Sequence, residues 1–511
     1  MREVYRALDA GGDRPALADA VERFSCCQLL DRARELVSVL REGYGVGPGT
    51  PVAVLAWSSP HAFALQLAVH HLGGRLVAVH PGAPASEQAA FLRSCRAELV
   101  VLEGPRFGDS GRALEACLPS GSAIGSLSPI EGFSWLGGPS STHSIPEISD
   151  DFSTVLYTGG TTGSPKPVLQ GGRFYRMVLQ VAAWGAAGTG RCGADFVCTS
   201  LTHASGQMSA ILSLLGGRAL EARQDCTAEE LLELIERRCV TGLFLFPSKL
   251  GHLLDMVIAT RWRRPRNLRY LTYGGGPMSV ARIDEAQRLL CPELTQVYGL
   301  TEATLVCSLG PDEHRDPMRR HLRSCGRAIP YMECQVRADD GSRLPTGDVG
   351  DVCVRGPFAT PGYLDEAGTL RPFPGGWCRT GDIGRLDRDG YLYLVDRAKD
   401  VIVTGTSTNL YSQLLEDQIL QCPSVAQAAV IGVPDRVHCE TAHACLVPAA
   451  GSVIDVEELN RAIVEAMGEP YRLASVDICD SLPQTSLGKI DKAALRARFW
   501  SKPEDRVALR E

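Results

Sequence analysis

The stretch Tyr157–Pro167, "YTGGTTGSPKP", gathers three glycines, three threonines, one serine and one lysine within eleven residues. It ends a short apolar run, "STVLY" (153–157). Glycines allow several backbone N–H groups to point into one concavity, because no Cβ atom stands in the way. The hydroxyl groups and the lysine add donors and a positive charge, so the stretch predicts a loop that holds a polyphosphate. Taken alone, it is as compatible with an ordinary surface loop, and its spacing is not that of a Walker loop.

Upstream of this loop, helical and strand patterns alternate. Segments 29–44 and 61–74 have apolar residues at helical spacing, whereas 51–57 and 75–81 are short apolar runs. Repeated strand–helix–strand units are typical of mostly parallel sheets covered by helices on both faces. We therefore expect an α/β fold for the large N-terminal part of the chain.

The pattern changes towards the C-terminus. Residues 320–400 carry short apolar runs separated by turn signals, which predict antiparallel, β-barrel-like structure. Beyond them, helix, strand, strand and helix patterns predict a small α+β unit of about 110 residues, a usual domain size. Because 511 residues exceed what one hydrophobic core supports, we predict two domains, 1–396 and a mobile 397–511. They meet at the charged bend Asp396–Asp400.

Composition and charge exclude several classes of protein. The formal net charge of −7 argues against a general nucleic-acid binder. The 18 cysteines are scattered and form no C-x-x-C, so we expect reduced thiols in a cytoplasmic protein. We find no signal-peptide pattern and no run of about 18 uncharged apolar residues, and therefore expect no transmembrane segment.

Further motifs follow the glycine-rich loop along the chain. They are "QVYGLTEA" (296–303), "CRTGDIG" (378–384), "VDRAKD" (395–400) and "PQTSLGKIDK" (483–492). With the loop, their order and spacing resemble the adenylate-forming superfamily of acyl- and aryl-CoA ligases, peptide-synthetase adenylation domains and luciferases. The stretches "SCGRAIP" (324–330) and "LPTGDVGDVCVRGP" (344–357) resemble the family's linking β region. The resemblance covers nearly the whole chain and implies that the loop holds the β- and γ-phosphates of ATP.

The resemblance implies roles for individual residues on the nucleotide side. The phosphate loop would contribute Thr158, Thr161, Thr162, Ser164 and Lys166. Tyr298 would stack on adenine, Asp382 would accept hydrogen bonds from both ribose hydroxyls, and Arg397 would support the ribose.

The resemblance also implies the residues around the reacting atoms. Thr301 would bond the α-phosphate, Glu302 would hold Mg²⁺, and Lys489 would bridge the carboxylate and the α-phosphate. Lys399 occupies the hinge position between the domains. These residue types suit the chemistry, because a carboxylate that attacks the α-phosphorus meets anion–anion repulsion that a cation and a lysine can neutralise.

The acid would bind beside His203, in "SLTHASGQMS" (200–209); a capping or core histidine is the alternative. An amino-acid substrate needs a carboxylate partner for its ammonium group, and "LTHASGQ" offers none. We therefore predict an aryl or alkyl carboxylic acid. Small residues predict a roomy site for a bulky or ring-containing acid of specialised metabolism; the expected lining is Ala204, Gly206, Phe246, Gly274, Gly275 and Gly276.

Two regions depart from the family pattern. In the phosphate loop, Gly159 replaces a serine, and Pro167, which lacks an N–H, replaces the final glycine. After the hinge, Thr406 stands where a second glycine is common, and Tyr411 and Gln413 replace a proline and a glutamate. The second region lines the pantetheine tunnel in the family, so thioester formation is less firmly predicted than adenylation.

Together these features predict a carboxylic acid:CoA ligase that needs ATP, Mg²⁺ and coenzyme A and releases AMP and pyrophosphate. An alternative within the class passes the acyl group to a carrier-protein thiol or an amine. An alternative of another class is a non-catalytic nucleotide-binding protein on the same fold. The joint presence of Glu302, Asp382 and Lys489 disfavours the last, because a binding module has no need of the lysine.

Overall fold

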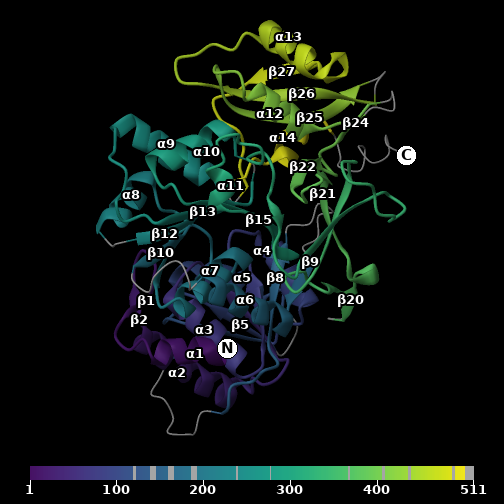
Figure 1. Ribbon diagram of the computed structural model, residues 1–511. Coiled ribbons are helices and arrows are strands. Elements are labelled where there is room, and N and C mark those ends of the chain that lie inside the picture. Colours follow the sequence, from purple (N-terminus) through teal and green to yellow (C-terminus); the bar gives the residue numbers. More distant parts are fainter. Residues whose placement is uncertain are drawn as a thin grey trace.

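The computed structural model describes residues 1–118, 122–137, 146–158, 166–185, 193–237, 240–276, 278–365, 369–404, 409–435, 439–485 and 489–500. Two nine-stranded sheets form the large N-terminal part. The C-terminal strands and helices gather at one end of the molecule, where they are drawn in yellow-green (Figure 1). This arrangement confirms the predicted fold class.

The first large sheet has a parallel centre. Neighbours pair in parallel from β8 through to β7, whereas β9, β19 and β20 are antiparallel. All residues of its central strand β3 are buried, with Val52 and Val54 in one core and Ala53 and Leu55 in another. The strands lie in the order β20 (Leu370–Pro372), β19 (Gly362–Leu364), β9 (Lys166–Gln170), β8 (Ser153–Thr158), β4 (Arg75–Val79), β3 (Pro51–Leu55), β5 (Leu99–Leu102), β6 (Ala123–Ser126) and β7 (Ser134–Trp135).

The second large sheet is parallel from β14 through to β1 and antiparallel at both edges. Its parallel strands end at a common edge, which is where α/β sheets usually bind ligands. The strands lie in the order β16 (Arg327–Ala328), β15 (Ala303–Leu309), β14 (Leu294–Leu300), β13 (Tyr270–Gly274), β12 (Val240–Leu245), β10 (Ala194–Val197), β11 (Ala219–Ala222), β1 (Pro15–Ala18) and β2 (Arg23–Ser25).

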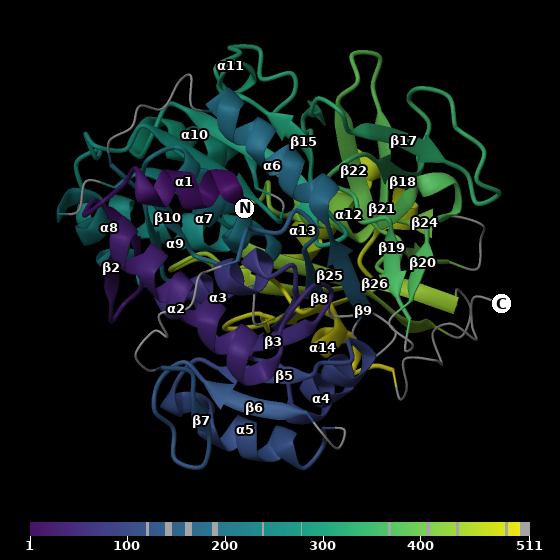
Figure 2. The ribbon, with the colours of Figure 1, turned by 90° about the horizontal axis from the view of Figure 1, so that it is seen from below.

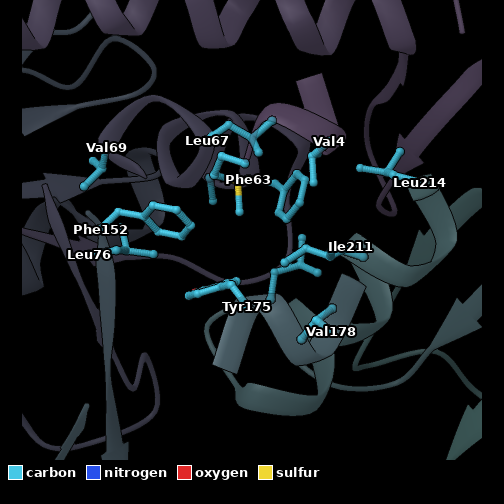
Figure 3. Packing of buried hydrophobic residues seen from close by; sticks show 14 of the residues in the cluster. Val4, Phe63, Leu67, Val69, Leu76, Phe152, Tyr175, Val178, Ile211 and Leu214 are labelled. Atoms are coloured by element: carbon cyan, nitrogen blue, oxygen red, sulfur yellow. The ribbon is translucent and has the colours of Figure 1, made fainter. Parts of the chain in front are cut away.

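Helices cover both faces of each large sheet. One core joins the two sheets through an inner layer of helices, in which Phe63 and Leu67 face Ile211 and Tyr175 (Figure 3). The inner helices are α1 (Arg2–Asp9), α2 (Cys26–Tyr44), α3 (Pro60–His71), α6 (Gly172–Gly185) and α7 (Ala204–Leu215). The outer face of the first sheet carries α4 (Ala85–Ser94) and α5 (Gly108–Glu115); that of the second carries α8 (Ala228–Arg237), α9 (Pro247–Thr260) and α10 (Val280–Leu289).

The predicted β-rich region is a four-stranded antiparallel sheet. A bridge between Arg327 and Tyr391 connects it to the β16 edge of the second large sheet. Figure 2 shows it at one side of the molecule, away from α5 and β7. Its strands are β17 (Glu333–Arg337), β18 (Gly350–Arg355), β21 (Cys378–Leu386) and β22 (Leu392–Arg397), and the short helix α11 (Pro311–His314) precedes it.

The C-terminal part is an α+β unit with its own cores. Helices α12 (Ser412–Ile419) and α13 (Val456–Met467) pack on one face of a three-stranded sheet, and α14 (Lys492–Arg496) packs on the other. The strands are β25 (Val425–Asp435), β26 (Cys439–Pro448) and β27 (Ser475–Ile478), with a separate pair β23 (Ile402–Val403) and β24 (Asn409–Leu410). Nowhere in the described ranges is there a helix with the length and apolar character needed to cross a membrane.

Candidate active site

Three predicted nucleotide-binding residues meet at the junction of the second large sheet and the β-rich sheet. Tyr298 near the end of β14 donates from Oη to Asp382 Oδ2 at 2.5 Å, and Arg397 Nε lies 2.7 Å from Asp382 Oδ1. Asp382 is 3% exposed. Burial and then the Asp382 carboxylate raise the pKa of Tyr298 well above its usual range. The Asp382 carboxylate is thus held in one orientation by two side chains from other strands.

The turn between β14 and β15 carries Thr301 and Glu302. Tyr363 of β19 donates from Oη to Glu302 Oε1 at 2.9 Å, and the Thr360 N–H donates to the Glu302 backbone carbonyl at 2.7 Å. Burial and then the Glu302 carboxylate raise the pKa of Tyr363. Because a phenol that stays protonated keeps donating, Tyr363 fixes the Glu302 carboxylate.

The two ends of the phosphate loop are adjacent. Thr158 pairs with Lys166 across β8 and β9, and Thr158 Oγ1 donates to the Lys166 carbonyl at 3.2 Å. The Lys166 ammonium lies 5.3 Å from the centre of the Tyr363 ring, so this end of the loop lies beside the residue that holds Glu302. The predicted loop residues Thr161, Thr162 and Ser164, together with Gly159, lie outside the described residues.

Lys489 reaches the site from the C-terminal unit. Its backbone is fixed in a short hairpin, where the Thr485 N–H donates to the Lys489 carbonyl at 2.7 Å. Its Cε lies 3.9 Å from the position that a Cβ on Gly275 would occupy, and Gly275 has a φ of +84° that favours glycine. Burial and then Arg397 lower the pKa of Lys489, whereas Asp382 raises it. Lys489 therefore lies close enough to Arg397 and Asp382 for their charges to act on its ammonium group.

His203 caps α7 and contributes to the same site. Its Nδ1 accepts from the Ser205 N–H at 3.3 Å and lies 2.8 Å from Ser205 Oγ. Burial, followed by the charges of Lys489 and His80, lowers the pKa of His203 to about 4. The ring is therefore neutral at pH 7, and because Nδ1 is an acceptor, its proton resides on Nε2. Sequence analysis left open a capping role and a site role, and His203 fits both.

A cavity of about 390 Å³ adjoins His203 and spans both parts of the chain. Trp57, Tyr157, Phe246 and Lys249 line it from the large part, and Gln484 and Thr485 line it from the C-terminal unit. Trp57 and Lys249 belong to none of the sequence motifs, so the sequence did not predict them as lining residues. His80, which also lines the cavity, directly follows the parallel strand β4, and that position is a signal that could have found it.

Of the six expected lining residues, only Phe246 lines the cavity. A Cβ on Gly206 would lie 2.1 Å from the Ser200 carbonyl oxygen, and one on Gly274 would lie 2.3 Å from that of Val297. Each of these two glycines allows two backbone segments to approach closely, which gives glycine a structural reason at both positions. Ala204 is buried in a small core with Ala78 and Leu156, and of these three only Ala78 lines the cavity.

The hinge position lies in a turn between two cores. Lys399 follows β22, and the C-terminal core begins at Ile402. Burial lowers the pKa of Lys399. Tyr411 precedes α12 as its N-cap residue without a side-chain cap, and Thr406 lies outside the described residues. The hinge role and the domain boundary stay predictions.

Fold and site together define a two-part protein in which the C-terminal unit brings Lys489 to the buried Asp382 carboxylate and its partners near the strand ends of the large part. Comparison with known sequence families agrees. Residues 4–364 match the family described as AMP-binding enzyme, and residues 414–489 match the AMP-binding enzyme C-terminal domain.

Similar proteins catalyse related reactions with different acceptors, as their names state. The chain is 31% identical to the medium/long-chain-fatty-acid–CoA ligase FadD8 of Mycobacterium tuberculosis, over 97% of this chain and 89% of that protein. It is 30% identical to the fatty acid–[acyl-carrier-protein] ligase ScoC of Streptomyces coeruleorubidus, over 94% and 92%. The solved structure of the amide bond synthetase McbA from Marinactinospora thermotolerans is 31% identical, with a TM-score of 0.87 over 98% and 99%. The chain belongs to the AMP-binding enzymes of the adenylate-forming superfamily, in the acyl- and aryl-CoA ligase branch.

Proposed function

We propose that the protein activates a carboxylic acid with ATP as an acyl-AMP and transfers the acyl group to coenzyme A. In the first step a carboxylate oxygen bonds to the α-phosphorus and pyrophosphate leaves. In the second step the thiol sulfur bonds to the acyl carbon, its proton passes to solvent, and AMP leaves. The observation that carries this proposal is the position of Lys489. The C-terminal unit places it against Gly275, beside Asp382 and its partners Tyr298 and Arg397, which we call the Asp382 group.

We assign the adenosine to the Asp382 group. A carboxylate offers acceptors only, which suits two ribose hydroxyl groups. Tyr298 and Arg397 hold that carboxylate at 2.5 and 2.7 Å, so it is oriented before ATP arrives. In the same assignment Tyr298 lies against adenine, and the phosphate loop from Thr158 to Lys166, including Thr161, Thr162 and Ser164, binds the β- and γ-phosphates.

The residues around Glu302 fit a Mg²⁺ ion. Mg²⁺ prefers carboxylate oxygens and keeps several waters, so one or two protein carboxylates are sufficient. Tyr363 donates a hydrogen bond to Glu302 Oε1, whereas none of the described residues donates one to Oε2, so Oε2 is the oxygen that could bind the ion. When bound there, Mg²⁺ would neutralise phosphate charge. Thr301, directly before Glu302, would bond the α-phosphate.

Lys489 would supply the second positive charge where negative charge accumulates. An ammonium on a flexible stem can follow the carboxylate and the α-phosphate as they bond. The neutral His203 ring would donate from Nε2 rather than act as a base. The cavity of about 390 Å³ beside His203 is the volume that can hold the acid and the incoming acceptor. Its aromatic lining supports an aryl or alkyl acid.

The two steps need two arrangements of the C-terminal unit, which we propose turns about Lys399. In the arrangement described here Lys489 is in the site, as adenylation requires. Gln484 and Thr485 line the cavity, so the same unit closes over the acyl side and excludes water. A cytoplasmic location is also proposed, since the fifteen cysteines whose side chains the structure describes are free thiols.

An amine acceptor is the second candidate. Two observations favour it: the departure of Tyr411 and Gln413 from the family pattern after the hinge, and the 31% identity to an amide bond synthetase over nearly the whole chain. A carrier-protein thiol is the corresponding candidate from the similarity to ScoC.

The test is a screen of carboxylic acids by acid-dependent pyrophosphate release, followed by the addition of acceptors. We expect aryl or alkyl acids to give pyrophosphate with ATP and Mg²⁺, and coenzyme A to give a thioester and raise turnover. Lys489→Met is the matched control, because methionine keeps most of the side-chain length without the charge. Pyrophosphate release without any thioester product, but with amide product from an amine, would replace the first candidate with the second. No acid-dependent pyrophosphate release with any acid would contradict both.

A further inference from the structure

A group of metal-ligand side chains lies in the C-terminal unit, outside the active site. His443 and Cys445 of β26 and Asp477 of β27 each offer one ligand atom, and these atoms lie within 4.8 Å of one another. The strands are parallel, with His443 opposite Ser475 and Cys445 opposite Asp477. Because side chains of alternate residues share a face, all four point to the same side of the sheet.

The distances match a tetrahedral zinc site. Cys445 Sγ lies 3.5 Å from His443 Nε2, which lies 3.7 Å from Asp477 Oδ2. Zinc bonds of about 2.0–2.3 Å place neighbouring ligands of a tetrahedron roughly 3.3–3.8 Å apart. Two of the three edges therefore already have the required length, and a small rotation of the partly exposed Asp477 would adjust the third.

The histidine is oriented in the way that metal-bound histidines usually are. His443 Nδ1 lies 2.7 Å from Ser475 Oγ, so the ring is fixed with Nε2 towards Cys445 and Asp477. A second hydrogen bond of this kind sets the tautomer and direction of a ligand. His443 and Cys445 are 2% and 0% exposed, so both are held in place by packing.

A fourth ligand is available from the same strand. Cys479 continues the pairing beyond β27, because its N–H donates to the Leu446 carbonyl at 2.8 Å. It is two residues beyond Asp477, on the same face, and packs in the core cluster that contains Cys445. Arg498 lies 3.0 Å from Asp477 Oδ2 and would share that carboxylate with a cation.

We propose that His443, Cys445, Asp477 and Cys479 bind one Zn²⁺ ion. Thiolate, imidazole and carboxylate groups together suit zinc rather than Mg²⁺ or Ca²⁺. Binding would release the two thiol protons to solvent. The two thiolates and the carboxylate carry three negative charges, which Zn²⁺ and Arg498 together balance.

The ion would be structural. Phe499, just after α14, packs on the His443 ring with centroids 4.6 Å apart, and α14 packs on the face that carries the cluster. Helix α14 begins three residues after Lys489. A metal here would fasten β26 and β27 beneath α14, the helix that follows the lysine hairpin, without touching the active site.

The test is metal binding by the full chain after removal of metals with a chelator. We expect one equivalent of tightly bound Zn²⁺ by elemental analysis after dialysis. With Co²⁺ as a probe, we expect thiolate-to-cobalt charge-transfer bands and the intense visible bands of a tetrahedral ion. Cys445→Ser, His443→Gln and the more exposed Asp477→Asn should each remove these signals, with folding checked by circular dichroism.

Two further variants separate this site from adventitious binding by the other cysteines. Cys95→Ser is the matched control, because Cys95 is equally buried at 1% exposure but belongs to no such group, and it should keep the full signal. Ser475→Ala should keep one equivalent with an affinity about 10–100-fold weaker, the usual effect of losing the partner that orients a ligand. No tetrahedral Co²⁺ spectrum in the parent protein, or the same spectrum in Cys445→Ser as in Cys95→Ser, would overturn the proposal.

Discussion

Replacing Asp382 with asparagine tests the nucleotide assignment directly. The change keeps the shape of the side chain but removes its charge and one acceptor oxygen. In the protein this carboxylate accepts from Tyr298 at 2.5 Å and pairs with Arg397 at 2.7 Å, and it is 3% exposed. If it also accepts from the ribose hydroxyls, Asp382→Asn weakens an interaction with a charged acceptor, which is worth about 1.5–3 kcal/mol.

That free energy corresponds to a change of about 10–150-fold in kcat/KM for ATP. The assay is acid-dependent ATP–pyrophosphate exchange at varied ATP and saturating acid, with ATP binding measured separately by calorimetry. We expect the KM for ATP to rise while the KM for the acid changes little.

The matched control is Asp351→Asn. Asp351 of β18 also pairs with an arginine, Arg379, in the same four-stranded sheet, and its side chain is 14% exposed. Both variants lose an ion pair of the β-rich sheet, so both should lose stability, but only Asp382→Asn should lose affinity for ATP. Equal ATP kinetics in the two variants would refute the ribose role of Asp382.

Three further variants test two other parts of the site and one histidine of the buried core. Lys489→Ala should slow adenylation by about 10²–10³-fold, the scale for one transition-state donor, and leave thioester formation from preformed acyl-AMP nearly unchanged; equal losses in the two half-reactions would contradict its role. Tyr363→Phe removes only the hydroxyl group that holds Glu302, and it should raise about tenfold the Mg²⁺ concentration that gives half-maximal adenylation. An unchanged Mg²⁺ titration would show that Glu302 needs no such support. Burial lowers the pKa of His70 to about 3, below its unfolded value of about 6.5, so the unfolded chain takes up the proton first and stability is lost as the pH falls below 6.5. Between pH 6.5 and 4.5, the free energy of unfolding measured with urea should therefore fall by about 2 kcal/mol less in His70→Gln than in the parent protein. An equal fall in both proteins would show that other groups cause the acid sensitivity.

The fold followed from patterns that depend on burial alone. Strand β3 is apolar at every position because both of its faces are covered, and the sequence shows this as an uninterrupted run. The helices between such runs, and the change to turn-rich segments after residue 320, were likewise visible without any knowledge of contacts. These patterns define layers, but they do not say which loops meet at the sheet edges.

Only part of the site could be predicted from the sequence. Tyr298 and Asp382 are 84 residues apart in the chain, and only the family resemblance brought them together before the structure did. Tyr363 was missed because it lies on a strand of only three residues, where one aromatic residue carries no periodic signal. Gly206 and Gly274 were expected to line the acid site, but a missing side chain has two uses: it leaves room for a ligand, or it lets backbones approach. A sequence cannot distinguish these uses, whereas the Cβ contact distances do.

Hydrogen bonds next to the proposed hinge hold the C-terminal unit in the arrangement described here. Asp396, three residues before Lys399, is buried and accepts from both the N–H and the Oγ of Ser412 at the start of α12. Lys492, which follows the lysine hairpin, donates to the same Ser412 Oγ at 2.8 Å. The hinge is therefore bordered by hydrogen bonds to a carboxylate, each worth about 1.5–3 kcal/mol. If the unit turns about Lys399 for the second step, the two bonds from Ser412 to Asp396 must break, whereas the Lys492–Ser412 bond lies within the turning unit, so the release of pyrophosphate and the new contacts of the acyl-AMP must offset the loss of those two bonds. A binding module would need no such cost, whereas an enzyme that performs two reactions with one mobile unit gains from holding Lys489 in place until the first reaction is complete.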